Sequence, residues 1–269
     1  MTKLLTALLV AAVLAGPAAA VGPWPGLAQS VIGPSGISYQ AVARAGFTTV
    51  TARRSGGAVV ASTRIPGAYG IPAVTSVGEA GGLSPSGKLL VLAPPPNYQR
   101  LRTQSRFVLL SAPSLTGART IVLRGEFGFD AISPNGRWLY VLQRVAANDL
   151  VRYVVRVYDL RTNRLLPGKI ADKGEPAETM RGMPIARATS ARGDWVYTLY
   201  TRDPETQSMF VHALNAAGRY AHCIDLPVAQ TQSRDLFSTK LKLNGRTLLV
   251  RDVDGNTLAR IDTRTLTVS

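Results

Sequence analysis

His212, His222 and Cys223 are the residues whose types could together do metal chemistry, because imidazole and thiolate groups are ligands that zinc prefers. They lie in the string FVHALNAAGRYAHCIDLP, which reads as two strands joined by a turn at 215–218. Alternate residues of a strand share a face, so His212 and Cys223 are expected diagonally on one face and His222 on the other. Two ligands do not complete a site. We therefore expect Cys223 to pack in the core, with no metal or other cofactor bound.

Carboxylates could support acid–base chemistry if two of them faced each other across a substrate. The loop candidates are Asp130, Asp149, Asp172, Glu175, Glu178, Asp203 and Glu205. The sequence pairs none of them. The string DVDGN at 252–256 resembles the start of a calcium loop, but it lacks the distal glutamate and is better explained as a hairpin turn. Nucleophile elbows, P-loops and dinucleotide fingerprints are absent, so no catalytic residue is predicted.

The string PPPNYQRLRTQSR at 94–106 could bind an anion. A proline run stiffens a segment, and guanidinium groups beside an aromatic ring suit phosphate or uronate groups. This reasoning predicts a ligand-binding site made by Tyr98, Arg100, Arg102 and Arg106. An exposed loop whose charge only keeps the protein soluble is the alternative.

The formal net charge of +15 favours anionic partners through long-range attraction. The arginines are scattered along strand-like segments rather than clustered, so no specific nucleic-acid partner is expected. Whether this charge is specific or only solubilising stays open.

A turn followed by a strand recurs along the chain. In SPNGRWLYVLQ, at 133–143, proline and Asn-Gly form the turn and the alternating aromatic and aliphatic residues form the strand. SPSGKLLVLA, at 84–93, has the same order. The turn glycines of the five recognisable copies are Gly46, Gly87, Gly136, Gly193 and Gly245, at intervals of 41, 49, 57 and 52 residues.

Repeats of this length with several strands each are typical of propeller blades. Further strands and turns follow each copy, as in VRVYDLRTNRLL at 155–166. The prediction is an all-β chain, a β-propeller of about five four-stranded blades, with six possible if one blade has diverged.

The strings SPNGRWLYV and VRVYDLRTNRLL resemble the repeats of YVTN-type, WD-type and TolB-like β-propellers. RIPGAYGIPAV and FVHALNAAGRYAHCIDLP are similar to strings in secreted or membrane-tethered bacterial proteins of unassigned function. The resemblance covers residues 37–269. It implies a fold shared by many functions, and the Gly-His and Trp-Asp signatures are missing.

The first residues have the layout of a signal peptide: Lys3, an apolar run and the small triplet Ala18-Ala19-Ala20. We expect cleavage after Ala20, a Pro- and Gly-rich tether at 21–36 and a propeller at 37–269. The apolar run is too short to span a bilayer, so the mature chain is expected to be extracytoplasmic and without a transmembrane segment. We also expect it to be a monomer.

These observations favour a non-catalytic binding or scaffold module that contacts a protein or an anionic cell-envelope polymer. The alternative is a propeller hydrolase or lyase that acts on a glycan or a lactone. We favour the binding module because metal-dependent propeller enzymes need ligands from several repeat units, whereas both histidines of this chain lie in one unit.

Overall fold

In the computed structural model the described residues are 25–97, 100–146, 148–149, 151–174, 179–202, 208–227 and 237–269. Within these ranges every regular element is a strand, so the all-β prediction is confirmed. The expected signal peptide, at 1–20, lies outside the described residues.

Five antiparallel sheets, named I to V here, follow one another in the described chain. Sheet I contains β2 (Ser30–Ile32), β3 (Ser38–Arg44), β4 (Phe47–Arg53) and β5 (Val59–Pro66); sheet II contains β7 (Leu89–Leu92), β8 (Gln104–Ser111) and β9 (Thr116–Arg124); sheet III contains β10 (Phe127–Ile132), β11 (Trp138–Arg144), β12 (Arg152–Asp159), β13 (Arg164–Leu165) and β14 (Met180–Arg181). Sheet IV contains β15 (Met183–Thr189), β16 (Trp195–Thr201), β17 (Met209–Asn215) and β18 (Tyr220–Asp225), and sheet V contains β19 (Lys240–Asn244), β20 (Thr247–Arg251) and β21 (Thr257–Asp262).

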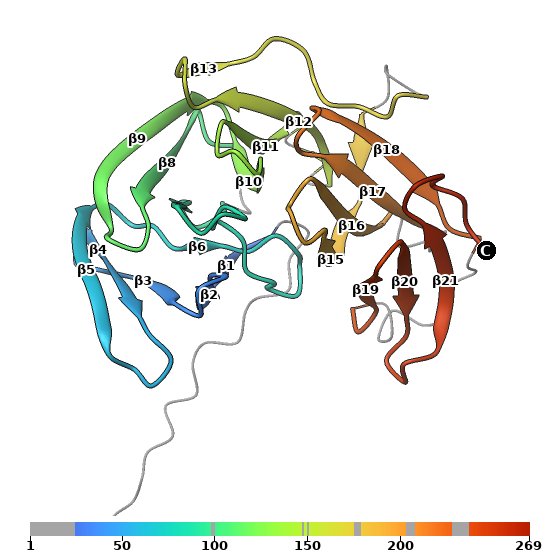
Figure 1. The fold of residues 1–269 in the computed structure, drawn as a ribbon. Helices are drawn as coiled ribbons and strands as arrows, with labels where there is room; N and C mark the ends of the chain where they lie inside the picture. Colours follow the sequence, from blue (N-terminus) through green and yellow to red (C-terminus); the bar gives the residue numbers. More distant parts are fainter. Residues whose placement is uncertain are drawn as a thin grey trace, which may run out of the picture.

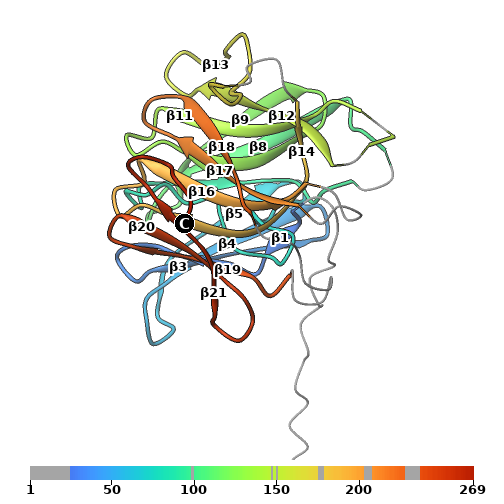
Figure 2. The same cartoon turned by 90° about the vertical axis from the view of Figure 1, so that its right-hand side faces the viewer.

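The sheets are arranged around a common centre, with β10, β15 and β19 on the inner side (Figure 1). Figure 2 looks onto sheet V, which lies at one end of the series. A short sixth pairing joins β1 (Leu27–Ala28) to β6 (Ile71–Pro72). Gly70 bridges to Ala93, so β6 extends sheet II on its inner side.

One tight turn recurs near the start of the sheets, as the repeat predicted: it joins β10 to β11 and β15 to β16, and it precedes β7 in sheet II. In these three sheets the N–H of Gly87, Gly136 or Gly193 donates to the carbonyl of the serine three residues earlier, at 2.8–2.9 Å. We call the end of the molecule that carries these turns the turn rim. Gly245 occupies the corresponding position in sheet V.

Sheet I departs from the expected alignment. Gly46 joins its second and third strands, and the matching turn is at Gly36, whose N–H donates to Gly33 O at 2.9 Å. The segment 21–36, expected as a tether, therefore contains β1, β2 and this turn from Leu27 onward. Its string GPSG has the same turn chemistry as SPSG at 84–87.

Four hydrophobic clusters hold consecutive sheets together. One cluster lies between sheets I and II, one between II and III, one between III and IV, and one between IV and V. Tyr140 and Tyr197 are buried in these clusters. Among the described residues no such cluster joins sheet V to sheet I, and Figure 1 shows the ring open on that side.

The turn rim gives the first prediction. Gly136 and Gly193 both have positive φ, at 69° and 75°, but a Cβ at Gly136 would meet nothing, whereas at Gly193 it would lie 2.3 Å from Pro85 Cγ of sheet II. Gly136→Ala should cost about 1–2 kcal/mol for the left-handed backbone alone. Gly193→Ala should cost clearly more, because the turn of sheet II must also shift. Chemical denaturation measures both variants, and equal losses would contradict the contact between the two turns.

Candidate functional site

The centre of the ring holds a buried ion pair between sheets III and IV. Arg187 on β15 places one Nη 2.5 Å from the Asp130 carboxylate and the other 2.6 Å from the Asp130 carbonyl. Its Nε donates to Thr198 Oγ1 at 3.0 Å. Asp130 is 3% exposed, so this pair links the two inner strands in an environment of low dielectric.

A β-bulge explains the geometry of Asp130. The register of β10 against β11 shifts between Phe129 and Ala131, which leaves Asp130 as the extra residue. A bulge frees a main-chain carbonyl from the ladder and turns the side chain of the extra residue. Asp130 can therefore offer both its carbonyl and its carboxylate to Arg187.

A polar row continues from Arg187 across sheet IV. Register pairing places Thr198 beside Arg187, His212 beside Thr198, and Cys223 beside His212. His212 is thus directly opposite Cys223 rather than diagonal, because the turn lies one residue later than predicted. Cys223 Sγ is 3.7 Å from His212 Nδ1 and 3.8 Å from Met180 Sδ.

The structure separates the two histidines as predicted. His222 pairs with Ala213, on the opposite face from His212, and stands edge-on to Tyr220. In the part of the chain that the structure describes, no three histidine, cysteine or acidic side chains are grouped to hold a metal. Cys223 packs against the cluster between sheets III and IV, but it is only partly buried.

A segment of sheet II crosses the centre. Residues 73–81 leave the inner side of sheet II, and Ser76 donates its N–H to Pro184 O of β15 at 2.7 Å. The segment also carries Glu79. Burial raises the pKa of its carboxyl, and the nearby positive charge of Arg187 opposes this rise. Thr75 Oγ1 accepts the Glu79 N–H at 3.0 Å, which fixes the turn within this segment.

A pocket of about 250 Å³ opens between this segment and the ion pair. Asp130, Arg187, Thr189 and Ser190 supply its polar lining, and the apolar lining includes Phe129 and Leu83. Pro85 and Ala191 also line it, so the pocket lies at the turn rim. It can hold a small polar group or a side chain of a partner.

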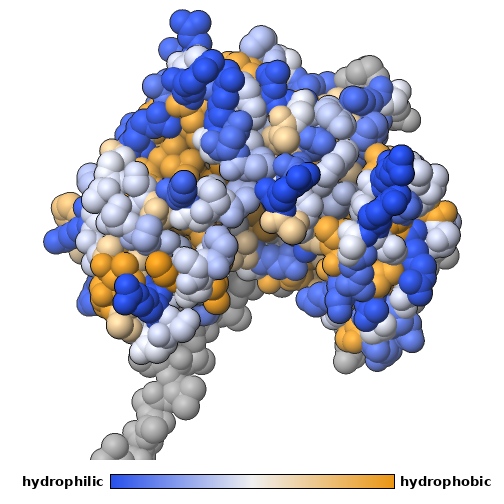
Figure 3. All heavy atoms as spheres, in the orientation of Figure 1, coloured by the Kyte–Doolittle hydropathy of each residue, from blue (hydrophilic) through white to orange (hydrophobic). Residues whose placement is uncertain are grey.

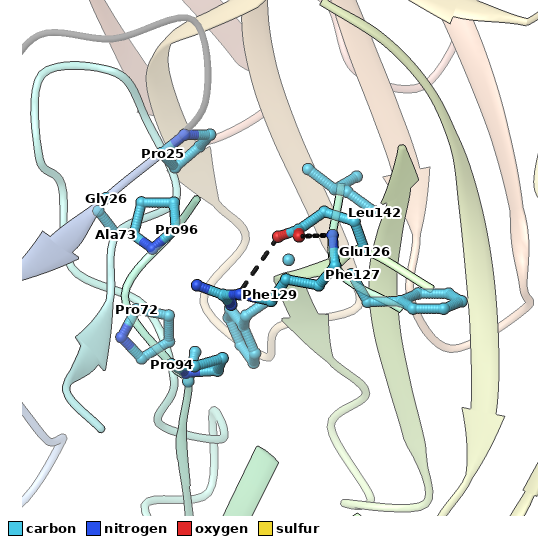
Figure 4. Close-up of a pocket in the computed structure, with 13 residues that line it drawn as sticks. Pro25, Gly26, Pro72, Ala73, Pro94, Pro96, Glu126, Phe127, Phe129 and Leu142 are labelled. Atoms are coloured by element: carbon cyan, nitrogen blue, oxygen red, sulfur yellow. Dashed lines mark hydrogen bonds and ion pairs between the residues drawn. The ribbon is translucent and has the colours of Figure 1, made fainter. Parts of the chain in front are cut away.

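The opposite end of the centre is nearly closed. The cavity there has a volume of only about 20 Å³, room for about one water. In Figure 4 the Glu126 carboxylate points toward a wall made by Pro25, Pro72, Pro94 and Pro96. Of these two cavities, the one at the turn rim is large enough for a ligand.

The predicted arginine site lies at this closed end, and the structure does not gather it into one cluster. Tyr98 lies outside the described residues. Arg102 turns inward: its N–H donates to Glu126 Oε2 at 2.8 Å, and its guanidinium contacts Glu126 Oε1 at 3.8 Å and bonds to Pro95 O. Arg106 is on β8 beside Gln104, and Arg100 is exposed. Anion binding by this set stays a prediction.

The candidate acids are dispersed. Asp149 pairs with Arg181 at 3.3 Å, and Asp172 accepts the main-chain N–H of Cys223. Glu175, Glu178, Asp203 and Glu205 lie outside the described residues. Asp252, in the string DVDGN, accepts the Asn256 N–H at 2.7 Å, as a hairpin turn requires.

Comparisons with known proteins find solved structures of low sequence identity. A TolB protein from Agrobacterium tumefaciens is 16% identical over 91% of this chain and 78% of that chain, with a TM-score of 0.44. A protein named as a 6-phosphogluconolactonase from Bacteroides uniformis is 14% identical over 89% of this chain and 68% of that chain, with a TM-score of 0.49. The Swd1 β-propeller domain from Myceliophteria thermophila is 13% identical over 85% of this chain and 62% of that chain, with a TM-score of 0.45. The antiparallel sheets that follow one another around a common centre make the chain a β-propeller. No family model or curated protein matches the chain.

Burial holds the ionisable groups near the ion pair in one protonation state. Desolvation lowers the pKa of His212 to about 4, and it raises the pKa values of Tyr140, Tyr153 and Tyr200. His212 is therefore neutral and the tyrosines protonated at neutral pH. Side chains in this condition suit positioning and packing better than proton transfer.

The ion pair gives a stability prediction. Arg187→Met should destabilise the fold by about 3–5 kcal/mol, because Asp130 would stay buried without its cation. Asp130→Asn combined with Arg187→Met should recover part of that loss, since the neutral amide needs no counter-charge. Chemical denaturation of the two single variants and the double variant measures the coupling. Additive losses would contradict a direct pair.

His212 gives a pH prediction. Its folded pKa lies below the unfolded value of 6.5, so protonation favours the unfolded chain, and stability should fall as pH drops from 6.5 toward 4. One proton contributes a slope of about 1.4 kcal/mol per pH unit. His212→Gln should flatten this slope between pH 6.5 and 5, whereas the control His222→Gln should keep it. An unchanged slope in His212→Gln would exclude His212 as its source.

Proposed function

We propose that this chain is an exported, non-catalytic binding module that contacts a protein or an anionic cell-envelope polymer through its turn rim. The observation that supports this proposal most is the pocket beside Asp130 and Arg187, a ligand-sized cavity of about 250 Å³. A rigid ring with a cavity at one end presents the loops around that cavity to a partner.

The chemistry around the pocket supports binding rather than turnover. All three guanidinium nitrogens of Arg187 have partners within sheets III and IV. His212 has no charge to exchange near neutral pH. A partner would find preformed polar groups and an apolar wall, which fix orientation without proton transfer.

The charge and the N-terminal sequence support the proposed location and partner. A net charge of +15 attracts anionic surfaces, and residues 1–20 have the composition of a cleaved signal. No helix of the described residues is long and apolar enough to cross a membrane. Mass spectrometry of the protein from its native host should find Val21 as the first residue; an N-terminus that retains the apolar run would contradict cleavage.

Filling the pocket tests the proposed contact. Ala191 is exposed and lines the pocket, so Ala191→Trp should block it while leaving the fold intact. Thr120→Trp, on the exposed outer strand of sheet II, is the matched control. Saturable binding to isolated envelopes should weaken by about tenfold or more in Ala191→Trp and stay unchanged in the control.

The nature of the partner follows from the same assay. Protease treatment of the envelopes leaves polymers and removes protein partners, so survival of binding identifies a polymer and its loss a protein. Equal binding by both tryptophan variants and the wild type would reject the turn rim as the contact surface.

A further inference from the structure

Within the part of the chain that the structure describes, the open side of the ring leaves one face of sheet I and one face of sheet V without a neighbouring sheet. Sheet I packs on sheet II through Tyr39, Val50, Ala52 and Ile65, which share one face of the sheet. Sheet V packs on sheet IV through Leu248, Val250, Ala259 and Ile261. The opposite face of each sheet points away from its neighbour, and Figure 3 shows a notch between the two ends of the series.

The unpartnered face of sheet V is cationic. Register pairing puts Lys240 with Arg251, and Leu249 with both Lys242 and Arg260, on this face. Asp262 is its one carboxylate among the described residues, and it already lies 3.8 Å from Arg246. Lys240, Lys242 and Arg260 are exposed.

The unpartnered face of sheet I combines cations with apolar side chains. Arg44, Arg53 and Arg64 are exposed on it, and no described acidic residue shares the face. Ile32, Val42, Phe47 and Val59 lie on the same face and are 70%, 52%, 40% and 54% exposed. The Arg64 guanidinium lies 3.9 Å from the Phe47 ring centroid. Half of the large hydrophobic residues exposed in the described chain are therefore on this one face.

We infer that the open side is a docking surface for an acidic protein segment in extended conformation, which lies against the unpartnered faces of sheets I and V. Carboxylates of such a segment would pair with the arginines and lysines, and its apolar side chains would cover Ile32 and Val42. This surface is separate from the pocket at the turn rim, so either proposal can fail without the other.

Charge and apolarity together select this occupant. A second copy of the chain would bring cations against cations, which opposes association through these faces. A highly hydrated polyanion would satisfy the charges but leave the apolar side chains in water. A protein segment with alternating acidic and apolar residues matches both properties, because the side chains on one face of a strand repeat every second residue.

Two short peptides test this inference with the intact protein. One alternates glutamate with valine, and the other alternates glutamate with serine, so both have the same charge. The glutamate–valine peptide should bind about tenfold more tightly. Polygalacturonate, a carboxylate polymer without apolar side chains, should bind weakly and lose its binding as salt increases.

Variants locate the binding. Arg44→Glu, Arg53→Glu and Arg64→Glu together should abolish peptide binding, whereas Arg124→Glu, Arg161→Glu and Arg164→Glu, exposed on sheets II and III, should weaken it only slightly despite the same charge change. Ile32→Ser with Val42→Ser should remove the preference for valine while keeping the charge-dependent part. Circular dichroism confirms that each variant is folded.

Three outcomes would overturn the inference: equal losses from the two triple variants, which would show that only overall charge matters; equal affinity for the two peptides; or a concentration-dependent dimer that is lost in the sheet I variant, which would assign this face to a second copy.

Discussion

Each sheet of this ring has two faces, and the burial of those faces is the constraint on which the structure depends. Four hydrophobic clusters satisfy it between consecutive sheets. Among the described residues, sheets II, III and IV have a neighbouring sheet on both faces, whereas sheets I and V each have one such neighbour. The strand patterns follow this difference in part: β11 is almost entirely buried, whereas β4 and β19 alternate buried or partly buried residues with exposed ones. In β20 of sheet V, however, Leu248, Leu249 and Val250 are all buried.

Polar contacts at the centre make the ring rigid where the clusters do not reach. The Asp130–Arg187 pair joins sheet III to sheet IV, and the Ser76–Pro184 hydrogen bond joins sheet II to sheet IV across the centre. Inside the cluster between sheets III and IV, Tyr140 adds a further link by donating its hydroxyl to Ala216 O at 2.8 Å. These links hold the walls of the pocket in place while the open side has no equivalent connection among the described residues.

Much of this architecture follows from local sequence chemistry. Proline–glycine turns and alternating strands predicted the all-β propeller, and the turns at Gly87, Gly136 and Gly193 formed where expected. The turn at Gly36 carries the same signal in GPSG, but its proline- and glycine-rich surroundings concealed the first strand. Asp130 and Arg187 are 57 residues apart, and only the bulge in β10 brings them together, so no local pattern predicts the pair. The unpartnered faces were equally hidden, because they depend on which sheets become neighbours.

Thiol labelling of single cysteines tests the open ring most directly. In a Cys223→Ala background, Val42→Cys and Lys242→Cys place thiols on the two unpartnered faces, and Val50→Cys and Val250→Cys place them on the covered faces of the same sheets. The account predicts rapid labelling of the first pair under native conditions and labelling of the second pair only on unfolding. Protection of both Val42→Cys and Lys242→Cys in the folded protein would show that the ring is closed on this side and would contradict the account.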